Sequence, residues 1–398
     1  MNDTFYAKIH ILYLRIFDVV VTVTSDSRQF IKSFGFVFQR FSVNAPNVLE
    51  SAGCLIECAV FTKGSNEWGR PVVVVDREVY PIHNLSLMEG YAYERIITAA
   101  FTRVCSHLLV HAGVVSYQGK GLLLVADAEH GKTTLTLELV KRGFAFLSDE
   151  VAALGRIDHR VHPFPRSLRI RSGTLELLDY PKQLSDSFVW LDKYTLDVEA
   201  FKPNSIGAAA QISAIIILRS RMHNDYEMQG RSHGSLRFLV ERTDDAFLSH
   251  AREIADISEF HLDYENGLPA IRFTASRPIY ALARFEALCK EHEILVLDTI
   301  KGRRTRPTFG LPARLEAIPK ITAVFELMSH FQSGYASEIL WKEFHGNASR
   351  LFHEFSAMVN HAECYQLFVG PLGQMADGIC SLVAQGFSPD RRLHGTSR

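Results

Sequence analysis

Residues 121–151, with the sequence GLLLVADAEHGKTTLTLELVKRGFAFLSDEV, decide the expected fold. An apolar run leads into Gly131-Lys132-Thr133-Thr134, an amphipathic stretch follows, and a second apolar run ends in acidic residues. This order predicts a strand, a tight loop, a helix and another strand. It fits a phosphate-binding loop with carboxylates behind it, and it equally fits a plain core strand, turn and core helix.

A phosphate-binding loop needs a strand that leads into a tight turn, a helix N-terminus and a lysine that reaches the β and γ phosphates. Residues 125–136 offer all of these. The strict G-x-x-x-x-G-K-[ST] pattern is not met, because Ala126 stands in place of its first glycine. Asp127 and Glu129 put two carboxylates where phosphates would be repelled, while Thr133 stands where such loops ligate Mg²⁺.

Two further features raise the nucleotide interpretation above the plain structural one. The apolar run FAFLSDE places Asp149 and Glu150 at the carboxyl end of a strand, which is where open α/β sheets bind ligands. One carboxylate can hold a metal ion and the other can accept a proton from a hydroxyl group. His111 interrupts the apolar strand LLVHAGVV; alone, such a histidine is more often a core residue than a catalytic one.

Composition excludes several classes of protein. The chain has 398 residues, 47% hydrophobic and 22% charged, which is typical of a globular protein of two or three domains. Its 43 basic and 44 acidic residues nearly cancel, so we expect neither a nucleic-acid partner nor an anionic membrane partner. No apolar run approaches the roughly 18 residues of a membrane span. The N-terminus lacks the pattern of a signal peptide, and we expect a cytoplasmic protein.

The cysteines and several histidines give no metal site. The six cysteines are scattered, and the Cys54/Cys58 spacing suits a metal on a helix but has no second ligand pair. Buried thiols are the preferred interpretation. The histidines in HNDYEMQGRSH and HGN lack the spacing of metal ligands.

The chain divides into three regions. Residues 1–95 predict an N-terminal α+β region, rich in strands, in which VVVVDREVY gives two strands around a turn at Asp76-Arg77. Residues 96–310 predict an α/β kinase core. Residues 311–398 predict a helical C-terminal subdomain, whose buried face includes Leu351 and Phe355.

The order of these motifs resembles the HPr kinase/phosphorylase family. The resemblance consists of His111-Ala112-Gly113-Val114, a two-strand hairpin, Gly131-Lys132-Thr133-Thr134, Arg142-Gly143 and Asp149-Glu150. The stretch SLRIRSGTLELL is similar to the E-I-R-G segment of that family, although Arg169 stands where the family carries glutamate. GKTTLTLELVKRGFAFLSDEVAAL followed by HPFPRSLRI looks closer to the HPr kinase-related branch found beside modified peptides, which includes kinases of lasso-peptide precursors.

The resemblance implies a fold and a set of roles. The fold would be an HPr kinase-like P-loop core, a mixed sheet with flanking helices. The residues around ATP would be those of the loop and the first helical turn: Ala126, Asp127, Ala128, Glu129, His130, Gly131, Lys132, Thr133 and Thr134. Thr133 and Glu150 would serve the Mg²⁺ ion.

The resemblance also implies the catalytic residues. Asp149 would be the general base for a serine hydroxyl, and Lys132 would hold the β and γ phosphates. His111 would lie near the transferred phosphoryl group, where it orients or charges the site. Arg171 would neutralise developing charge, and Arg166 is a second candidate from the branch alone. Positioning and electrostatics of this kind are what phosphoryl transfer requires.

The expected activity is ATP- and Mg²⁺-dependent phosphorylation of a serine on a peptide or small protein, such as a lasso-peptide precursor. A small-molecule kinase and a non-catalytic nucleotide-binding scaffold remain as alternatives. The charged stretch KGRRTRP, residues 301–307, is either a solvated loop or a site for an acidic leader peptide or a carboxylate. The family forms rings, so the resemblance implies a homo-oligomer, although no sequence feature identifies a subunit interface.

Overall fold

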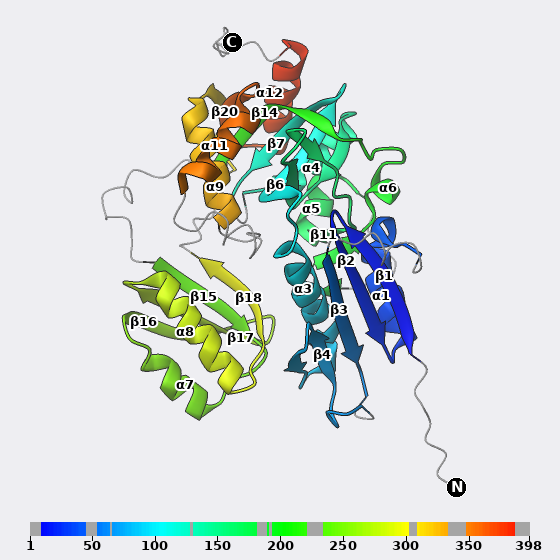
Figure 1. Ribbon diagram of the computed structural model, residues 1–398. Coiled ribbons are helices and arrows are strands. Elements are labelled where there is room, and N and C mark those ends of the chain that lie inside the picture. Colours follow the sequence, from blue (N-terminus) through cyan, green and yellow to red (C-terminus); the bar gives the residue numbers. More distant parts are fainter. Residues whose placement is uncertain are drawn as a thin grey trace.

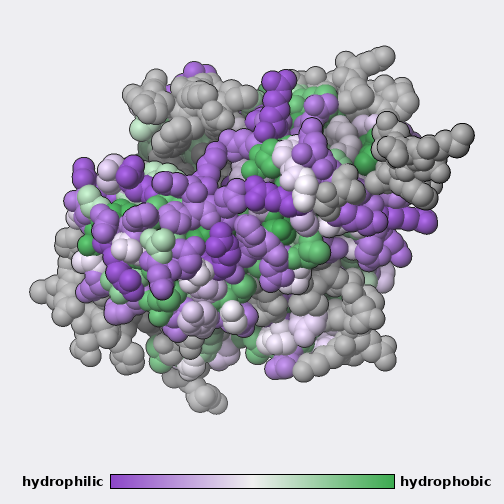
Figure 2. Space-filling model, turned by 90° about the horizontal axis from the view of Figure 1, so that it is seen from below, coloured by the Kyte–Doolittle hydropathy of each residue, from purple (hydrophilic) through white to green (hydrophobic). Residues whose placement is uncertain are grey.

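The computed structural model describes residues 9–44, 54–63, 66–127, 130–180, 189–190, 193–220, 234–301, 309–332 and 348–386. Within these ranges the strands form four sheets, and Figure 1 shows them as a mixed α/β architecture. No helix in the described ranges is both long and apolar enough to cross a membrane. The face seen in Figure 2 is mainly hydrophilic where it is coloured, with apolar side chains in small areas.

The N-terminal region is a five-stranded sheet with helices α1 (Arg28–Val37) and α3 (Met88–Phe101) packed against it. Its strands, in sheet order, are β1 (His10–Ile16), β2 (Val19–Ser25), β3 (Cys54–Phe61), β4 (Val72–Val75) and β5 (Glu78–Pro81). Asp76 and Arg77 both have positive φ, as a tight two-residue hairpin turn requires, which confirms the predicted turn. Short 3₁₀ helices follow α1 at Gln39–Phe41 and precede α3 at Leu85–Leu87.

The central sheet carries the candidate site. Its order is β10-β9-β6-β7-β14-β20-β19, and β8 also pairs with β6. The bounds are β6 (His107–Tyr117), β7 (Lys120–Val125), β8 (Ala145–Ser148), β9 (Val151–Gly155), β10 (Arg160–His162), β14 (Ala210–Arg219), β19 (Arg314–Ala317) and β20 (Glu363–Phe368). Strands β7, β14 and β20 are parallel, so their carboxyl ends meet at one edge.

Helices cover both faces of this sheet. Side chains alternate along β7, so that Leu123 and Val125 pack toward α9 (Lys320–Gln332) and α11 (Ala348–Val359). Leu122 and Leu124 pack on the opposite face, in the core that contains residues of α4 (Lys132–Lys141) and α12 (Leu372–Ala384). The apolar run of β7 is therefore buried on both sides, as in other parallel sheets.

The C-terminal region differs from the expected helical subdomain. Leu351 and Phe355 are buried as predicted. The same region, however, supplies β20, which pairs with β14, and β19, which pairs with β20. Because backbone hydrogen bonds join these strands to the central sheet, this region completes the core, and the boundary predicted at residue 311 does not divide two units.

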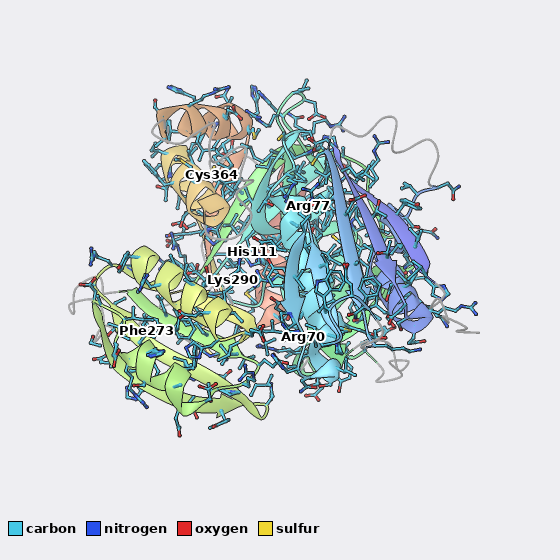
Figure 3. The ribbon with its side chains drawn as sticks, turned by 60° about the horizontal axis from the view of Figure 1, so that its bottom comes forward. Arg70, Arg77, His111, Phe273, Lys290 and Cys364 are labelled. Carbon is cyan, nitrogen blue, oxygen red and sulfur yellow. The ribbon has the colours of Figure 1, made fainter. Side chains whose placement is uncertain are left out.

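Residues 234–301 instead form a separate small module within the expected core. Its elements are β15 (Gly234–Val240), α7 (Asp245–Arg252), β16 (Ile257–Glu265), β17 (Leu268–Ala275), α8 (Pro278–Glu291) and β18 (Val296–Lys301). The antiparallel order β16-β17-β15-β18 is the split βαβ, or ferredoxin-like, arrangement. The stacked rings of Phe238, Phe273 and Phe285 lie at its centre, and Figure 3 labels Phe273 there.

Polar contacts attach this module to the N-terminal region. Arg70 donates to both carboxylate oxygens of Glu293, at 2.9 and 2.7 Å. Glu241 accepts hydrogen bonds from the backbone N–H groups of His83 and Asn84. The module therefore lies beside α3, as Figure 1 shows.

A three-stranded sheet lies beside the candidate site. It consists of β11 (Leu168–Arg171), β13 (Lys193–Leu196) and β12 (Val189–Trp190), in that order. The short helix α5 (Ser172–Leu177) follows β11, and α6 (Val198–Phe201) follows β13. Its strands bring the stretch SLRIR next to the α3 helix of the N-terminal region, since Arg169 on β11 pairs with Glu94 on α3.

Candidate functional site

The loop after β7 has the backbone of a strand-to-helix turn that could bind an anion. Gly131 has a left-handed φ of 78° and precedes α4 directly. Its carbonyl accepts the first helical hydrogen bond, from Leu135 N at 2.8 Å. The N–H groups of the first turn of α4 are consequently directed out of the helix end, where the dipole favours negative charge. Ala126 is buried behind the loop, while Ala128 and Glu129 lie outside the described residues.

Gly113 lets the lysine helix approach the sheet. A Cβ atom at this position on β6 would lie 2.5 Å from Thr136 Oγ1 and 3.2 Å from Lys132 Cγ. The shorter of these contacts does not occur between real atoms without a shift of the helix or the strand. The glycine of the His-Ala-Gly-Val motif is therefore required where α4 crosses β6.

Lys132 is buried in an environment that leaves its charge uncompensated. Its side-chain Nζ is inaccessible to solvent and has no hydrogen-bond partner among the described residues. Burial lowers its pKa from 10.5 to about 7, and the nearby carboxylates of Asp149 and Asp127 oppose this shift only in part. A buried ammonium group with three free donors is suited to an anionic ligand.

The acidic pair lies opposite the middle of β6. Strands β8 and β9 pair with successive parts of β6, and Asp149 and Glu150 occupy the turn between them. Ser148 Oγ fixes this turn by accepting from the N–H of Glu150 at 3.3 Å and of Val151 at 3.0 Å. The carbonyl of Glu150 accepts from Ala112 N at 3.1 Å. The acids therefore belong to a rigid turn, and not to a solvated loop.

The two acids have different environments. Asp149 is buried, and its Oδ1 has no hydrogen-bond partner among the described residues. Glu150 forms an ion pair with Arg166, whose side chain is buried. The predicted metal role of Glu150 stays a prediction, since its carboxylate is already paired with a cation.

His111 lies on β6 directly opposite Val151, beside the acidic turn, and Figure 3 labels it. Its pKa is held well below 6.5, first by burial and then by repulsion from Lys132, His330 and Arg166. His111 is therefore a neutral imidazole at pH 7, a form that can orient a group by hydrogen bonding. The expectation that it adds positive charge does not fit this environment.

His330 joins the site without any signal in the sequence. It lies on α9, with Nε2 3.6 Å from Asp127 Oδ1 and Nδ1 2.9 Å from the carbonyl of Glu326. The proximity of His330 lowers the pKa of Asp127. Because His330 is about 200 positions from the loop in sequence, only the packing of α9 on the central sheet brings the two together.

The other predicted residues lie around the loop. His130 is buried, and Thr133 is half-buried in the first turn of α4. Thr134 Oγ1 lies 3.1 Å from Thr174 Oγ1, which ties α4 to α5. Arg171 is exposed at the end of β11, and Arg166 forms an ion pair with Glu150.

The described residues contain no cluster of three or more His, Cys, Asp or Glu side chains that could hold a metal ion alone. Mg²⁺ commonly takes only one or two protein ligands and completes its shell with phosphate oxygens and water. Thr133 is suitable as such a ligand. Cys54 and Cys58 lie on β3 and not on a helix, and both thiols are free.

The charged stretch KGRRTRP falls almost entirely outside the described residues, because residues 302–308 are not described. Phe309 comes shortly after it and lies against the loop: a Cβ atom on Gly131 would lie 3.5 Å from its ring.

No protein-family model matches this chain, and no curated protein matches it either. Among solved structures it matches the Hpr(Ser) kinase/phosphatase from Coxiella burnetii, with 16% sequence identity and a TM-score of 0.21. The match covers 46% of this chain and 98% of that chain. A TM-score this low carries no argument about fold or function, so a function must be inferred from the geometry of the site and from its motifs.

Proposed function

We propose that this protein is a kinase that uses ATP and Mg²⁺ to phosphorylate a hydroxyl group. The observation that carries the proposal is the juxtaposition of two buried, unpartnered groups at the end of β7. Lys132 Nζ and Asp149 Oδ1 both lack hydrogen-bond partners among the described residues, and each lies within electrostatic range of the other. Buried polar atoms in folded proteins are normally paired, so both are suited to groups of a ligand.

The residues present fit the triphosphate of a nucleotide. Lys132 and the N–H groups of the first turn of α4 would hold the β and γ phosphates, and Gly131 leaves the backbone open to them. Thr133 would ligate Mg²⁺, which neutralises charge on the phosphates when bound. Asp127 adds a negative charge at this loop, and His330 Nε2 lies 3.6 Å from its Oδ1.

Asp149 is the candidate general base. Its rigid turn holds the carboxylate near Lys132, where an acceptor hydroxyl would meet the γ-phosphoryl group. It would accept the hydroxyl proton as the new phosphoester bond forms. His111, as a neutral imidazole, would orient the acceptor or the phosphoryl group.

The acceptor class comes from the sequence resemblance. The motifs resemble kinases that phosphorylate serine, and the stretch 131–170 is most similar to those that act on ribosomal peptide precursors, including lasso peptides. The proposed acceptor is therefore a serine of a peptide or small protein.

Transfer of ³²P from [γ-³²P]ATP to a panel of serine peptides tests this proposal. The wild type should label a peptide, Asp149→Asn should bind Mg·ATP but lose most of the labelling, and Lys132→Ala should lose both. General-base contributions of about 10²–10⁴-fold set the expected loss for Asp149→Asn. Equal labelling by wild type and Asp149→Asn would refute the assigned base, and nucleotide binding without labelling of any acceptor would support the non-catalytic alternative.

A further inference from the structure

The stretch HPFPRS, residues 162–167, lies against the acidic turn without belonging to the phosphate loop. The N–H group of Phe164 donates to the carbonyl of Leu147 at 2.8 Å, shortly before the two acids. Arg166 forms an ion pair with Glu150, the second of these acids. The stretch is therefore bound to the chain both before and after the candidate base.

The other side of this stretch is anchored in the N-terminal region. The ring of Phe164 is fully buried. Its centre lies 5.8, 4.8 and 5.4 Å from the centres of three aromatic rings of that region, those of Phe17, Phe41 and Phe101. Ser167 is bonded to α1, since its N–H donates to the carbonyl of Val37 at 3.0 Å and its Oγ to that of Phe36 at 3.1 Å. Residues 162–167 therefore connect the acidic turn to the N-terminal region.

Arg166 lies where these two parts meet, and only 4% of its side chain is exposed. Its Nη2 pairs with Glu150, and its Nη1 donates to the carbonyl of Ser167 at 2.9 Å. Its guanidinium group also lies 5.8 Å from the centre of the Tyr93 ring on α3. A buried guanidinium group with an ion pair, a backbone hydrogen bond and an aromatic ring beside it keeps one orientation. Such a group is better suited to hold the carboxylate of Glu150 than to move onto a ligand.

The charge of Arg166 matters because Asp149 and Glu150 are neighbours in one turn, where like charges repel each other. Burial raises the pKa of Tyr93, and the charges of Arg166 and Asp149 both reach its hydroxyl group. Without Arg166, Glu150 would be an unbalanced anion next to the candidate base. Without Glu150, Arg166 would be a buried cation that could pair with Asp149 instead. Either change would disturb the carboxylate that accepts the proton.

We propose that Arg166 is a positioning residue, which pairs with Glu150 and holds the acidic turn on the N-terminal region so that Asp149 stays available as the base. This inference rests on the proposed kinase function. It gives Arg166 no contact with the phosphates and Glu150 no contact with Mg²⁺, in contrast to the roles that the sequence resemblance implies. It also makes the N-terminal region part of the catalytic unit.

Removal of each charge alone and of both together tests this pair. Arg166→Gln, Glu150→Gln and the double variant are compared with the wild type in the peptide-labelling assay, for kcat and KM, and in calorimetry of Mg·ATP. Arg156→Gln is the matched control. Arg156 donates to both carboxylate oxygens of Glu354 on α11, at 2.9 and 2.8 Å, just beyond the opposite end of β9. Near-UV circular dichroism checks that each variant is folded.

Each single change should lower kcat about 100-fold, as the misplacement of a catalytic group does, and leave Mg·ATP affinity and KM unchanged. The double variant should recover most of the lost turnover, because neither an unbalanced anion nor an unbalanced cation remains. It should also exceed Glu150→Gln, a comparison that holds even where Arg166→Gln does not fold. Arg156→Gln should keep the wild-type kcat. A double variant no faster than Glu150→Gln would overturn the proposal in favour of direct contacts with phosphate or Mg²⁺.

Hydrogen exchange followed by mass spectrometry tests the positioning without turnover. Peptides that cover residues 145–152 should exchange faster in each single variant than in the wild type, and the double variant should regain protection. Arg156→Gln should match the wild type over these peptides. Unchanged exchange in the single variants would overturn the proposal. The expected exchange, together with a wild type that labels no peptide, would refute the kinase proposal and the catalytic part of this inference with it.

Discussion

At the scale of single residues, the site combines charges that the free protein does not neutralise. Lys132 is buried beside Asp149, yet no ion pair joins the two among the described residues. A buried charge without a partner lowers the stability of the folded protein. Such destabilising features are found mainly at sites of binding or catalysis. The pKa of Lys132 is low because burial disfavours the charged form of its side chain.

Removal of this charge should stabilise the ligand-free protein. The folded-state pKa of Lys132 is about 7 and its ordinary value is 10.5, so between these values the unfolded chain holds more protons than the folded one. Stability should therefore rise with pH across this window because of Lys132. Lys132→Met should remove that part of the slope and be more stable at pH 7 and below, by an amount on the order of a few kcal/mol.

Urea unfolding at pH 7, 8 and 9 measures this difference, with Lys141→Met, at the exposed end of α4, as the control. Parallel pH profiles for Lys132→Met and the wild type would mean that Lys132 is not buried as a strained cation.

At the scale of secondary structure, the site depends on how closely α4 approaches β6. The sequence motif His-Ala-Gly-Val drew attention to His111 and gave no reason for Gly113. The structure gives one, since Thr136 and Lys132 lie where a Cβ atom would stand. Three parts of the site lie where α4 crosses β6: the N-terminus of the helix, Lys132 and the acidic turn. A small shift of α4 should therefore disturb all three.

Gly113→Ala tests this crossing. The added methyl group meets Thr136 Oγ1 and Lys132 Cγ, and it should cost about 1–3 kcal/mol in unfolding free energy, as overpacking does. It should also weaken Mg·ATP binding. Gly173→Ala on α5, where a Cβ atom meets nothing within 4 Å, should leave both unchanged or slightly improve stability. Chemical denaturation and calorimetry give the two readouts; wild-type values for Gly113→Ala would mean that the close crossing of α4 and β6 does not require glycine.

At the scale of the whole molecule, the C-terminal region completes the sheet that holds the loop. Strand β20 pairs with β14 along six residues, and α9 carries His330 to Asp127. A chain that ends at residue 310 would leave β14 as an edge strand and expose the face that α9 and α11 cover. That truncated chain should therefore fail to fold cooperatively, as measured by near-UV circular dichroism and thermal unfolding. A cooperative transition and intact Mg·ATP binding would restore the sequence-based view of a separate helical subdomain.

The local features were predictable and the long-range ones were not. The β6–β7 hairpin, the helix after Lys132 and the turn at Asp76-Arg77 follow from apolar patterns and turn residues that are close in sequence. The position of β20 depends on a pairing between strands some 150 residues apart, which no local pattern encodes. The same holds for His330 in the site and for the ferredoxin-like module, whose strands read individually as ordinary β segments.

The most direct test of phosphate binding at this loop is calorimetric titration of Mg·ATP into the wild type and Lys132→Ala at pH 7.5. We expect binding by the wild type, accompanied by proton uptake in buffers of different ionisation enthalpy, because the phosphates raise the pKa of Lys132 from about 7. We expect no binding by Lys132→Ala. Absence of binding by the wild type, or equal binding by both proteins, would contradict the claim that this loop holds phosphates.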